Sequence, residues 1–401
     1  MSFQNVIGQK EIKQHLVELV QHNRLSHALL FLGSEGSGAL SLAIAFAQYV
    51  VCEKTSLQET SEQSLFGDEL PTSDVRRLMS DACGICSACI KAQKLVHPDI
   101  HFSYPVIPKK SGDKPVSADY ISEWREFILQ YPYGNVYDWL QFIGAENKQG
   151  NITAQECSEI IHTLNLKSFE SKYKILVMWM PEYLGNEGNK LLKLIEEPPD
   201  NTLFILVAEN ESLILPTIIS RTQLVKIPSL ETSDVENALI TRAKTPEIQA
   251  RQIASICEGN YREALQFLQH AEYDWQELLR EWLNAVLKTG PIAQVKWIDE
   301  ISKIGREKQK QFLRYFNHLL EQAIHIRIIG EAVQLRIPLN ENDFTIRLNK
   351  LADISQQQAI IEELDKATYY IERNANAKLL FHALTIKLYH IIANKQIVEV
   401  L

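Results

Sequence analysis

The sequence lacks an excess of basic residues, a long apolar run and a secretory leader pattern. Its 41 basic residues are outnumbered by 50 acidic ones, and the net charge of −9 argues against a surface coated with basic patches for nucleic acid. No stretch approaches the roughly 18 consecutive apolar residues of a membrane span. The first residues lack a charged start followed by an apolar core. We therefore expect a cytoplasmic protein in which the 6 cysteines stay reduced.

The chain is long enough for two or three domains. It has 401 residues, of which 45% are apolar and 23% charged, as in ordinary soluble globular proteins. Strand and helix signals alternate up to about residue 228, which predicts a parallel sheet with helices on both faces. Beyond that point the strand signals stop. The remainder reads as three short helices over residues 231–271, followed by an almost wholly helical segment over 273–401.

Five short apolar segments are the expected strands of this sheet. They lie at residues 28–32, 100–104, 175–180, 203–208 and 222–227. The third is apolar throughout, which is typical of a central parallel strand. Helices are expected over residues 39–51 and 154–166, and over 189–197, where two prolines end the last one.

Two segments have the composition of insertions into this alternating pattern. Residues 53–77 are polar with little periodicity and are expected to form a surface insertion. Residues 106–150 combine a polar loop with short helices whose aromatic residues look exposed. Because these aromatics have few basic neighbours, ordinary packing or a partner contact is favoured over stacking on nucleic-acid bases.

The loop after the first strand resembles a phosphate-binding loop. Residues 33–40 read Gly-Ser-Glu-Gly-Ser-Gly-Ala-Leu, between a predicted strand and a predicted helix. Gly33, Gly36 and Gly38 would let backbone N–H groups surround a phosphate at the helix N-terminus. However, Ala39 and Leu40 stand where the lysine and the magnesium-binding hydroxyl belong. The bland alternative is a tight strand-to-helix turn.

The acidic residues that a nucleotide hydrolase needs are also missing. They are expected at the end of a neighbouring strand, where they hold magnesium and orient water. Here Trp179 and Met180 fill those positions, and Glu182, further along, is expected at the surface. Together with the missing lysine and hydroxyl, this predicts a nucleotide-enzyme fold that no longer hydrolyses nucleotide.

Four cysteines have the spacing of a structural metal site. Cys83, Cys86 and Cys89 form Cys-x₂-Cys-x₂-Cys. Cys52 precedes them, and the stretch that separates it from Cys83 is long for such a site. Four sulfurs suit tetrahedral zinc and leave no open position for catalysis. The alternative is a set of free buried thiols. The other two cysteines, Cys157 and Cys257, lie on apolar helices and are expected in the core.

Taken together, these motifs resemble the delta-prime subunits of the bacterial DNA polymerase III clamp loader, a family of the AAA+ class. The resemblance covers the first 270 residues apart from the two insertions, with a weaker match at residues 373–379. Active ATPase subunits of the same loader share most of the motifs but would keep the lysine. The matching segments are residues 7–9, 24–28, 33–38, the cysteine set, 97–99, 190–199 and 215–221.

The resemblance implies a fold and a division into domains. It implies an α/β fold, an AAA+ P-loop parallel sheet domain with a zinc-module insert, followed by a small helical lid and an all-α collar. The α/β domain would span residues 1–228, with the zinc insert at about 52–90 and the second insertion at about 106–150. The three-helix lid would span residues 229–272, and the oligomerisation collar 273–401.

The resemblance also implies a role and partners. The chain would help to load the sliding clamp on primed DNA, alongside the gamma/tau ATPase subunits, the delta subunit and the polymerase core of the holoenzyme. Arg221 matches the family's arginine finger, which reaches the ATP of a neighbouring subunit; on residues alone it could equally face water or a local carboxylate. Arg262 matches the second sensor and, with no triphosphate to sense, is expected in a structural ion pair.

Two other readings stay open at this point. One is an active AAA+ replication ATPase with an unusual loop, which Ala39 argues against. The other is a zinc-dependent DNA-binding adaptor outside the clamp loader, which the negative net charge argues against.

Overall fold

The computed structural model describes residues 1–55, 80–110, 112–145, 150–269, 274–329, 339–372 and 375–395. The chain divides into two compact units, the first made of Met1–Ala250 and Cys257–Leu265 and the second of Arg251–Ile256 and Gln266–Leu401. Most of the polar stretch predicted at residues 53–77, and the start of the weak match at residues 373–379, lie outside the described residues.

The first unit is built on a five-stranded parallel sheet in the order β2-β3-β4-β1-β5. All five predicted strands are confirmed, and β3 is an interior strand, paired with β2 and β4 and buried along its whole length, as its apolar run predicted. Each crossover between parallel strands carries chain over a face of the sheet, as the alternating pattern required. The strands are β1 (Ala28–Gly33), β2 (Ile100–Ser103), β3 (Lys174–Trp179), β4 (Thr202–Ala208) and β5 (Gln223–Ile227).

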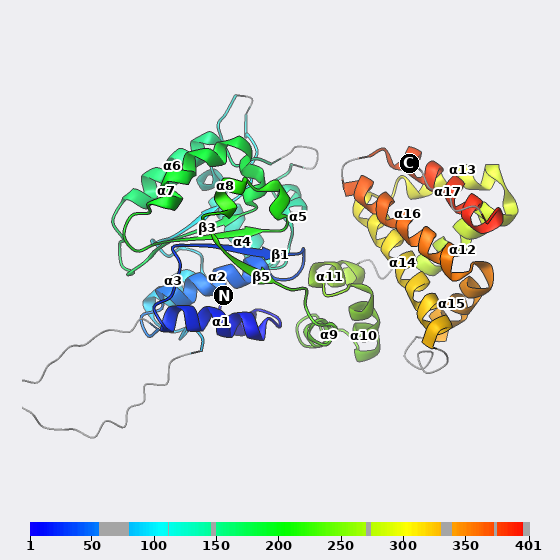
Figure 1. The fold of residues 1–401 in the computed structure, drawn as a ribbon, viewed down its shortest axis with the longest axis horizontal. Helices are drawn as coiled ribbons and strands as arrows, with labels where there is room; N and C mark the ends of the chain where they lie inside the picture. Colours follow the sequence, from blue (N-terminus) through cyan, green and yellow to red (C-terminus); the bar gives the residue numbers. More distant parts are fainter. Residues whose placement is uncertain are drawn as a thin grey trace, which may run out of the picture. The chain divides into compact units, whose positions relative to one another are not determined.

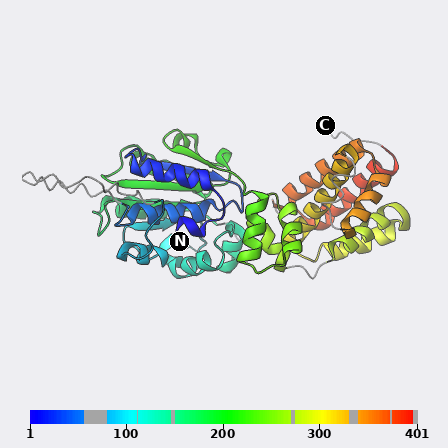
Figure 2. The same ribbon diagram turned by 90° about the horizontal axis from the view of Figure 1, so that it is seen from below.

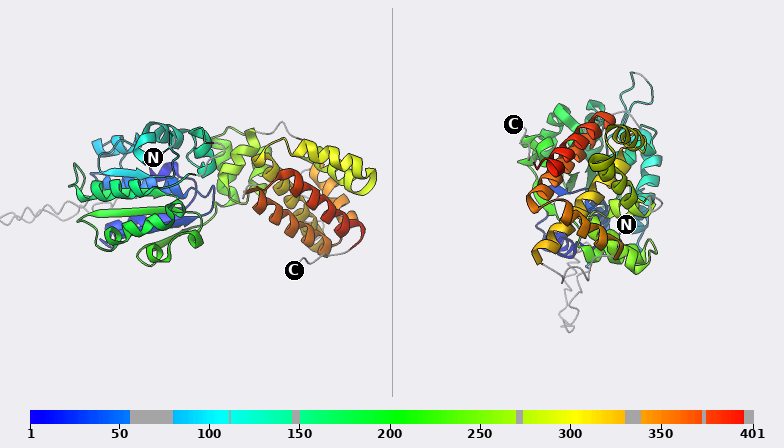
Figure 3. Two further views of the ribbon diagram at one scale, coloured as in Figure 1. Left: turned by 90° about the horizontal axis from the view of Figure 1, so that it is seen from above. Right: turned by 90° about the vertical axis from the view of Figure 1, so that its right-hand side faces the viewer.

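Helices cover both faces of this sheet, as predicted (Figure 1). One face packs on α1 (Lys10–Gln21), α2 (Ala39–Val51) and α3 (Ser87–Gln93), which lie in front of the strands when seen from below (Figure 2). The other face packs on α6 (Ala154–Asn165), α7 (Leu192–Glu196) and α8 (Pro216–Ile219), seen from above in Figure 3. Short 3₁₀ turns occupy Phe3–Asn5, Ser117–Tyr120 and Glu211–Leu213.

The second insertion packs its aromatic residues inward, so the expectation of exposed aromatics was wrong for most of them. Trp124 on α4 (Ile121–Gln130) and Trp139 on α5 (Val136–Phe142) are both 0% exposed. Tyr104 stacks on Trp124 with ring centroids 4.0 Å apart, and Trp139 donates its indole N–H to the carbonyl of Pro105. Burial of large rings outweighs the polar character of the flanking loops, which is what misled the sequence interpretation. The reading as ordinary packing fits these contacts.

The helix predicted over residues 189–197 was also wrong in its extent. The structure has a 3₁₀ segment over Pro181–Leu191, and only α7 over Leu192–Glu196 is α-helical. Gly185 interrupts the 3₁₀ segment with φ +51° and ψ −141°, a positive-φ conformation that glycine adopts without a steric penalty. A break of this kind leaves no clear mark on hydrophobic periodicity.

Three short helices follow the sheet, as predicted: α9 (Thr232–Thr241), α10 (Glu247–Ile256) and α11 (Tyr261–Gln269). They are shared between the two compact units, because most of α11 belongs to the first unit and the end of α10 to the second. The division into three domains therefore stays a prediction.

The second unit is helical throughout its described residues. Its core centres on Trp282 and Trp297, which stack with centroids 4.7 Å apart and pack against Phe312 and Phe381. The long helices α14 (Arg306–Ile329) and α16 (Ile354–Glu372) run side by side (Figure 1). None of the helices described in either unit is long and apolar enough to cross a membrane. The elements are α12 (Trp275–Asn284), a π-helical turn (Ala285–Thr289), α13 (Pro291–Ile301), α14 (Arg306–Ile329), α15 (Leu339–Leu351), α16 (Ile354–Glu372) and α17 (Ala377–Ala393).

His318 on α14 makes the stability of the helical unit depend on pH. Its burial, reinforced by the nearby His325, lowers the pKa of the imidazole to about 4. An imidazole in the unfolded chain titrates near 6.5, so protonation favours the unfolded chain. The stability of the unit that depends on a neutral His318 is complete above that pH and is lost as the pH falls towards 4. We expect the free energy of unfolding of this unit to be about 2 kcal/mol lower at pH 5 than at pH 7. In urea titrations His318→Leu should remove that difference, and an equal pH dependence in both proteins would contradict it.

Candidate functional site

The glycine-rich loop has the backbone of a phosphate-binding loop. Gly36 and Gly38 adopt φ values of +73° and +84°, and α2 begins directly afterwards at Ala39. A side chain at position 36 would overlap Asn260, since its Cβ would lie 1.8 Å from the amide oxygen. Ala39 and Leu40 are both buried, and their hydrocarbon side chains offer neither a cation nor a hydroxyl.

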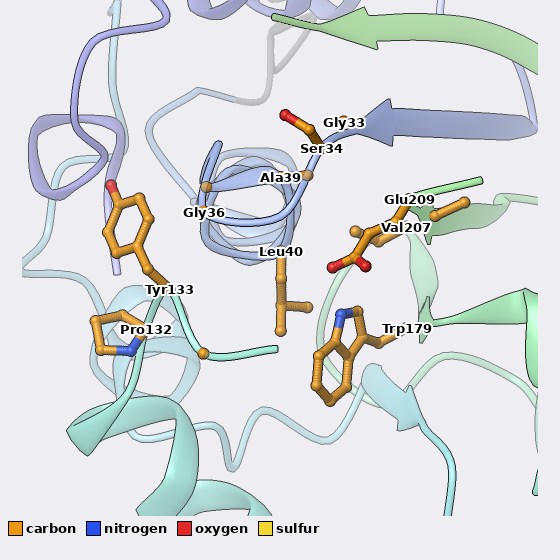
Figure 4. A pocket seen from close by; sticks show the side chains of 13 residues that line it. Gly33, Ser34, Gly36, Ala39, Leu40, Pro132, Tyr133, Trp179, Val207 and Glu209 are labelled. Carbon is orange, nitrogen blue, oxygen red and sulfur yellow. The ribbon is translucent and has the colours of Figure 1, made fainter. Parts of the chain in front are cut away.

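The hollow beside this loop is too small for a nucleotide. Its volume is about 30 Å³, enough for one or two water molecules, whereas ligand pockets usually span some 300–1,000 Å³. Leu40 points across the hollow towards Trp179, and Pro132 and Tyr133 close another side (Figure 4). The space that a phosphate would need is therefore occupied by side chains of the protein itself.

Among the described residues, the ends of the strands beside this hollow offer it one acidic side chain, Glu209 after β4 (Figure 4), and no acidic pair. Trp179 ends β3 and is 3% exposed, and Met180 follows it with a left-handed backbone. Glu182 is not the surface residue that we expected. It is half-buried, and its Oε1 accepts the backbone N–H groups of Glu209 and Asn210 at 2.7 and 2.9 Å. Burial raises the pKa of Glu182 despite these hydrogen bonds, which fits a structural role at the end of β4.

Residues of the second insertion lie directly on the loop. The Tyr133 ring covers Gly38 so closely that a Cβ there would be 2.7 Å from it. The Tyr133 hydroxyl accepts the backbone N–H of Ile7 at 2.7 Å, and Ser41 donates to the carbonyl of Pro132 at 2.5 Å. Nothing in the sequence signals this contact, because the two segments are about a hundred residues apart.

Arg262 forms the structural ion pairs that were expected of it. Its guanidinium is 5% exposed and lies between Glu35 of the glycine-rich loop and Asp138 of α5. The distances are 2.8 Å from Nη1 to Glu35 Oε1, and 2.5 and 2.6 Å from Nε and Nη2 to Asp138. Neither carboxylate was predicted from the sequence as a partner of Arg262. The one indication was an acidic residue, Glu35, inside a loop that would otherwise bind phosphate.

Arg221 lies just after α8 and is one-third exposed. It forms an ion pair with Glu196 at the end of α7 and donates to the carbonyl of Thr217 at 2.8 Å. In the isolated chain Arg221 therefore binds a local carboxylate, which was the structural alternative to a role as an arginine finger. Exposure of 33% leaves part of the guanidinium accessible from outside.

The four candidate metal ligands lie together. The sulfur atoms of Cys52, Cys83, Cys86 and Cys89 are all within 4.8 Å of one another, and none forms a disulfide. Cys83 Sγ and Cys89 Sγ are 3.8 Å apart, the spacing of two sulfurs about 2.3 Å from one tetrahedral ion. Cys52 is far from the other three cysteines in the sequence, but it follows the last turn of α2, and this helix end lies beside them.

The surroundings of the sulfurs also suit a cation. Backbone N–H groups of Cys83, Cys86 and Cys89 each donate to a cluster sulfur at 3.4 Å, as around bound thiolates. Burial raises the pKa of Cys52 and of Cys89, whereas at Cys83 backbone N–H groups outweigh burial and lower the pKa to about 7. Four thiols in this arrangement could hold a metal ion. Cys157 and Cys257 are buried elsewhere, as predicted.

The sequence matches the family described as "DNA polymerase III, delta subunit" over residues 8–231, which is more than half of the chain. Among its relatives are two from Bacillus subtilis, the "DNA polymerase III subunit tau" and the "DNA polymerase III subunit delta'". Each is 24% identical, over 80% and 66% of this chain. The chain spans only 46% and 60% of the lengths of these two relatives.

Solved structures give a weaker likeness. The chain is similar to a "dna polymerase iii, gamma subunit-related protein" from Thermotoga maritima, with a TM-score of 0.38 and 15% identity, covering 94% of this chain and 98% of that one. On the family match and the sequence relatives, the chain belongs to the DNA polymerase III delta subunit family, as a delta' subunit or a close relative of one.

Proposed function

We propose that this chain is a non-hydrolysing, delta'-type subunit of the DNA polymerase III clamp loader. It would act in the cytoplasm with the gamma/tau ATPase subunits and the delta subunit to open the sliding clamp and place it on primed DNA. The family match supports the complex, while tau and gamma relatives leave the type of subunit to be decided by the site.

The filled phosphate loop is the observation that carries this proposal. A hydrolysing subunit needs a lysine, a magnesium ligand and a cavity for the triphosphate. This chain has Ala39 and Leu40 at the first two positions and a hollow of about 30 Å³ in place of the cavity. Each deficit alone would lower phosphoryl transfer by orders of magnitude.

Two surfaces would let a passive subunit contribute to the complex. Arg221 would leave Glu196 and place its charge at the ATP of a neighbouring ATPase subunit. In the helical unit, α17 presents Leu379, Ile386 and Tyr389 to solvent, with 70%, 57% and 42% exposure. An apolar face of this kind suits packing against helices of sister subunits, as a collar requires.

The cysteine cluster would hold a structural zinc ion. Thiolate ligands alone select zinc over magnesium or calcium, and four of them leave no position open to substrate. The ion would join Cys52 at the end of α2 to the segment that leads into α3. Its role would be to stabilise this part of the α/β unit.

Reconstitution tests the proposed function. The purified chain alone should show no ATP turnover above buffer, because its loop cannot take the triphosphate. Mixed with the gamma/tau and delta subunits, it should co-elute as one complex and be required for clamp loading on primed DNA. Turnover by the chain alone would instead support an active ATPase. Tight, salt-sensitive DNA binding without assembly would support a separate DNA-binding adaptor.

A further inference from the structure

We propose that residues 132–138 are a built-in substitute for a bound nucleotide. This segment, here called the strap, fills the phosphate loop and ties α11 to it through side chains. The proposal goes beyond the role in clamp loading, because it concerns how the first unit is held together in the isolated chain.

The centre of the tie is the buried guanidinium of Arg262. A triphosphate would offer this arginine anionic oxygens at the loop; here the oxygens come from two carboxylates of the chain. Asp138 of the strap accepts two hydrogen bonds from it, one on each carboxylate oxygen, of 2.5 and 2.6 Å, and Glu35 of the loop accepts one of 2.8 Å. Paired hydrogen bonds between a guanidinium and a carboxylate fix direction as well as distance.

The two carboxylates are themselves held in place. Asn135 caps α5 by accepting the N–H of Asp138 at 2.9 Å, and its own N–H donates to Asp138 Oδ2 at 3.2 Å. The Asn135 amide also donates to Glu35 Oε2 at 2.8 Å, which links the strap to the loop directly. Asn260, at the start of α11, donates to the other oxygen of Glu35 at 3.4 Å. Loop, strap and α11 thus share one network.

Apolar contacts reinforce the network on the side of the hollow. Tyr133 of the strap lies over Gly38 and meets Tyr261, the first residue of α11, edge to face with ring centroids 5.0 Å apart. The backbone N–H of Tyr261 donates to the carbonyl of Gly36 at 3.3 Å. Aromatic pairs of this geometry add about 0.5–1.5 kcal/mol beyond the area that they bury.

The charges at the loop also exclude an external ligand. Glu35 and Asp138 outnumber Arg262, so a triphosphate would meet net negative charge where an active subunit has a lysine. The strap would have to be displaced from the hollow before any phosphate could approach. The orientation of α11 on the loop is therefore independent of nucleotide.

Hydrogen exchange on the full chain tests the strap. The variant Glu35→Gln with Asp138→Asn keeps side-chain size but removes both charges from Arg262. We expect amide exchange over residues 260–266 to rise at least tenfold in this variant, since a buried ion pair is replaced by neutral contacts. In the wild type, 5 mM MgATP should leave exchange in this segment unchanged. The matched control is Glu126→Gln on α4, whose carboxylate accepts a hydrogen bond from Gln130 in the same helix and from no other side chain in the part of the chain that the structure describes.

Two results would overturn the proposal. One is unchanged protection of residues 260–266 in the double variant; the other is a rise in wild-type protection when MgATP is added. If the double variant does not fold, as judged by circular dichroism, Asp138→Asn alone is measured against the same control. Because every arm uses the isolated chain, a failure of clamp loading in reconstitution leaves these readouts unaffected.

Discussion

The purified chain is expected to carry one equivalent of zinc, and Cys89→Ser should abolish it. Each thiolate is a quarter of the coordination shell, and Cys89 is fully buried within it. Structural zinc sites contribute roughly 10–16 kcal/mol of binding free energy to the folding of the segments that they join. Without the ion, residues 80–93 should lose protection from proteolysis. The metal content is measured by plasma mass spectrometry, and cleavage is followed over time with trypsin.

Loss of the metal should also destabilise the N-terminal 3₁₀ turn (Phe3–Asn5). Asp81, next to the cluster, accepts the backbone N–H groups of Phe3 and Gln4, both at 3.0 Å. The matched control is Cys157→Ser, because Cys157 is equally buried but lies outside the cluster, on α6. The control should keep its full zinc content. A Cys89→Ser protein that retained one equivalent of zinc, or a wild type purified without any, would contradict the metal site.

Arg221→Ala should cripple ATP hydrolysis at the neighbouring subunit of the reconstituted complex. A guanidinium supplied in trans stabilises charge in the transition state and is worth roughly 10³-fold or more at the site it serves. The ATP turnover of the whole complex should fall by the fraction that this one site contributes to it. The experiment compares clamp- and DNA-stimulated ATP turnover of complexes that contain the wild-type or the variant chain.

Two controls separate this role from a structural one. Arg221 is one-third exposed, so its removal should change the stability of the isolated chain by no more than an exposed ion pair, about 0–1 kcal/mol. Glu196→Gln frees the arginine from its partner within the chain and should leave turnover at the wild-type level or above. Full turnover with Arg221→Ala would show that the residue serves only its local contact.

The sequence was sufficient for the elements whose signals are local. All five strands and the helix after the glycine-rich loop were predicted, because apolar runs and glycine spacing record strand burial and turns directly. The 3₁₀ segment that ends at Leu191 was not predicted, since its geometry depends on the break at Gly185. The buried aromatics of the second insertion were misread, because burial there results from contacts between segments and not from periodicity.

The candidate site shows the same contrast. The missing lysine and hydroxyl could be seen in the sequence at Ala39 and Leu40, and the cysteines indicated four metal ligands, with Cys52 set apart by a long gap. The residues that close the loop could not be predicted from the sequence. Tyr133 and Asn135 reach it from a segment about a hundred residues away, and a single sequence does not show which distant segments come into contact.

Helix α2 gives the glycine-rich loop and the cysteine cluster a common mechanical frame. It runs from Ala39 to Val51, between Gly38 and Cys52, so about 20 Å of buried helix connects the loop to the cluster. The two sites are therefore positioned relative to each other by one buried helix, and not by the loops that precede and follow it.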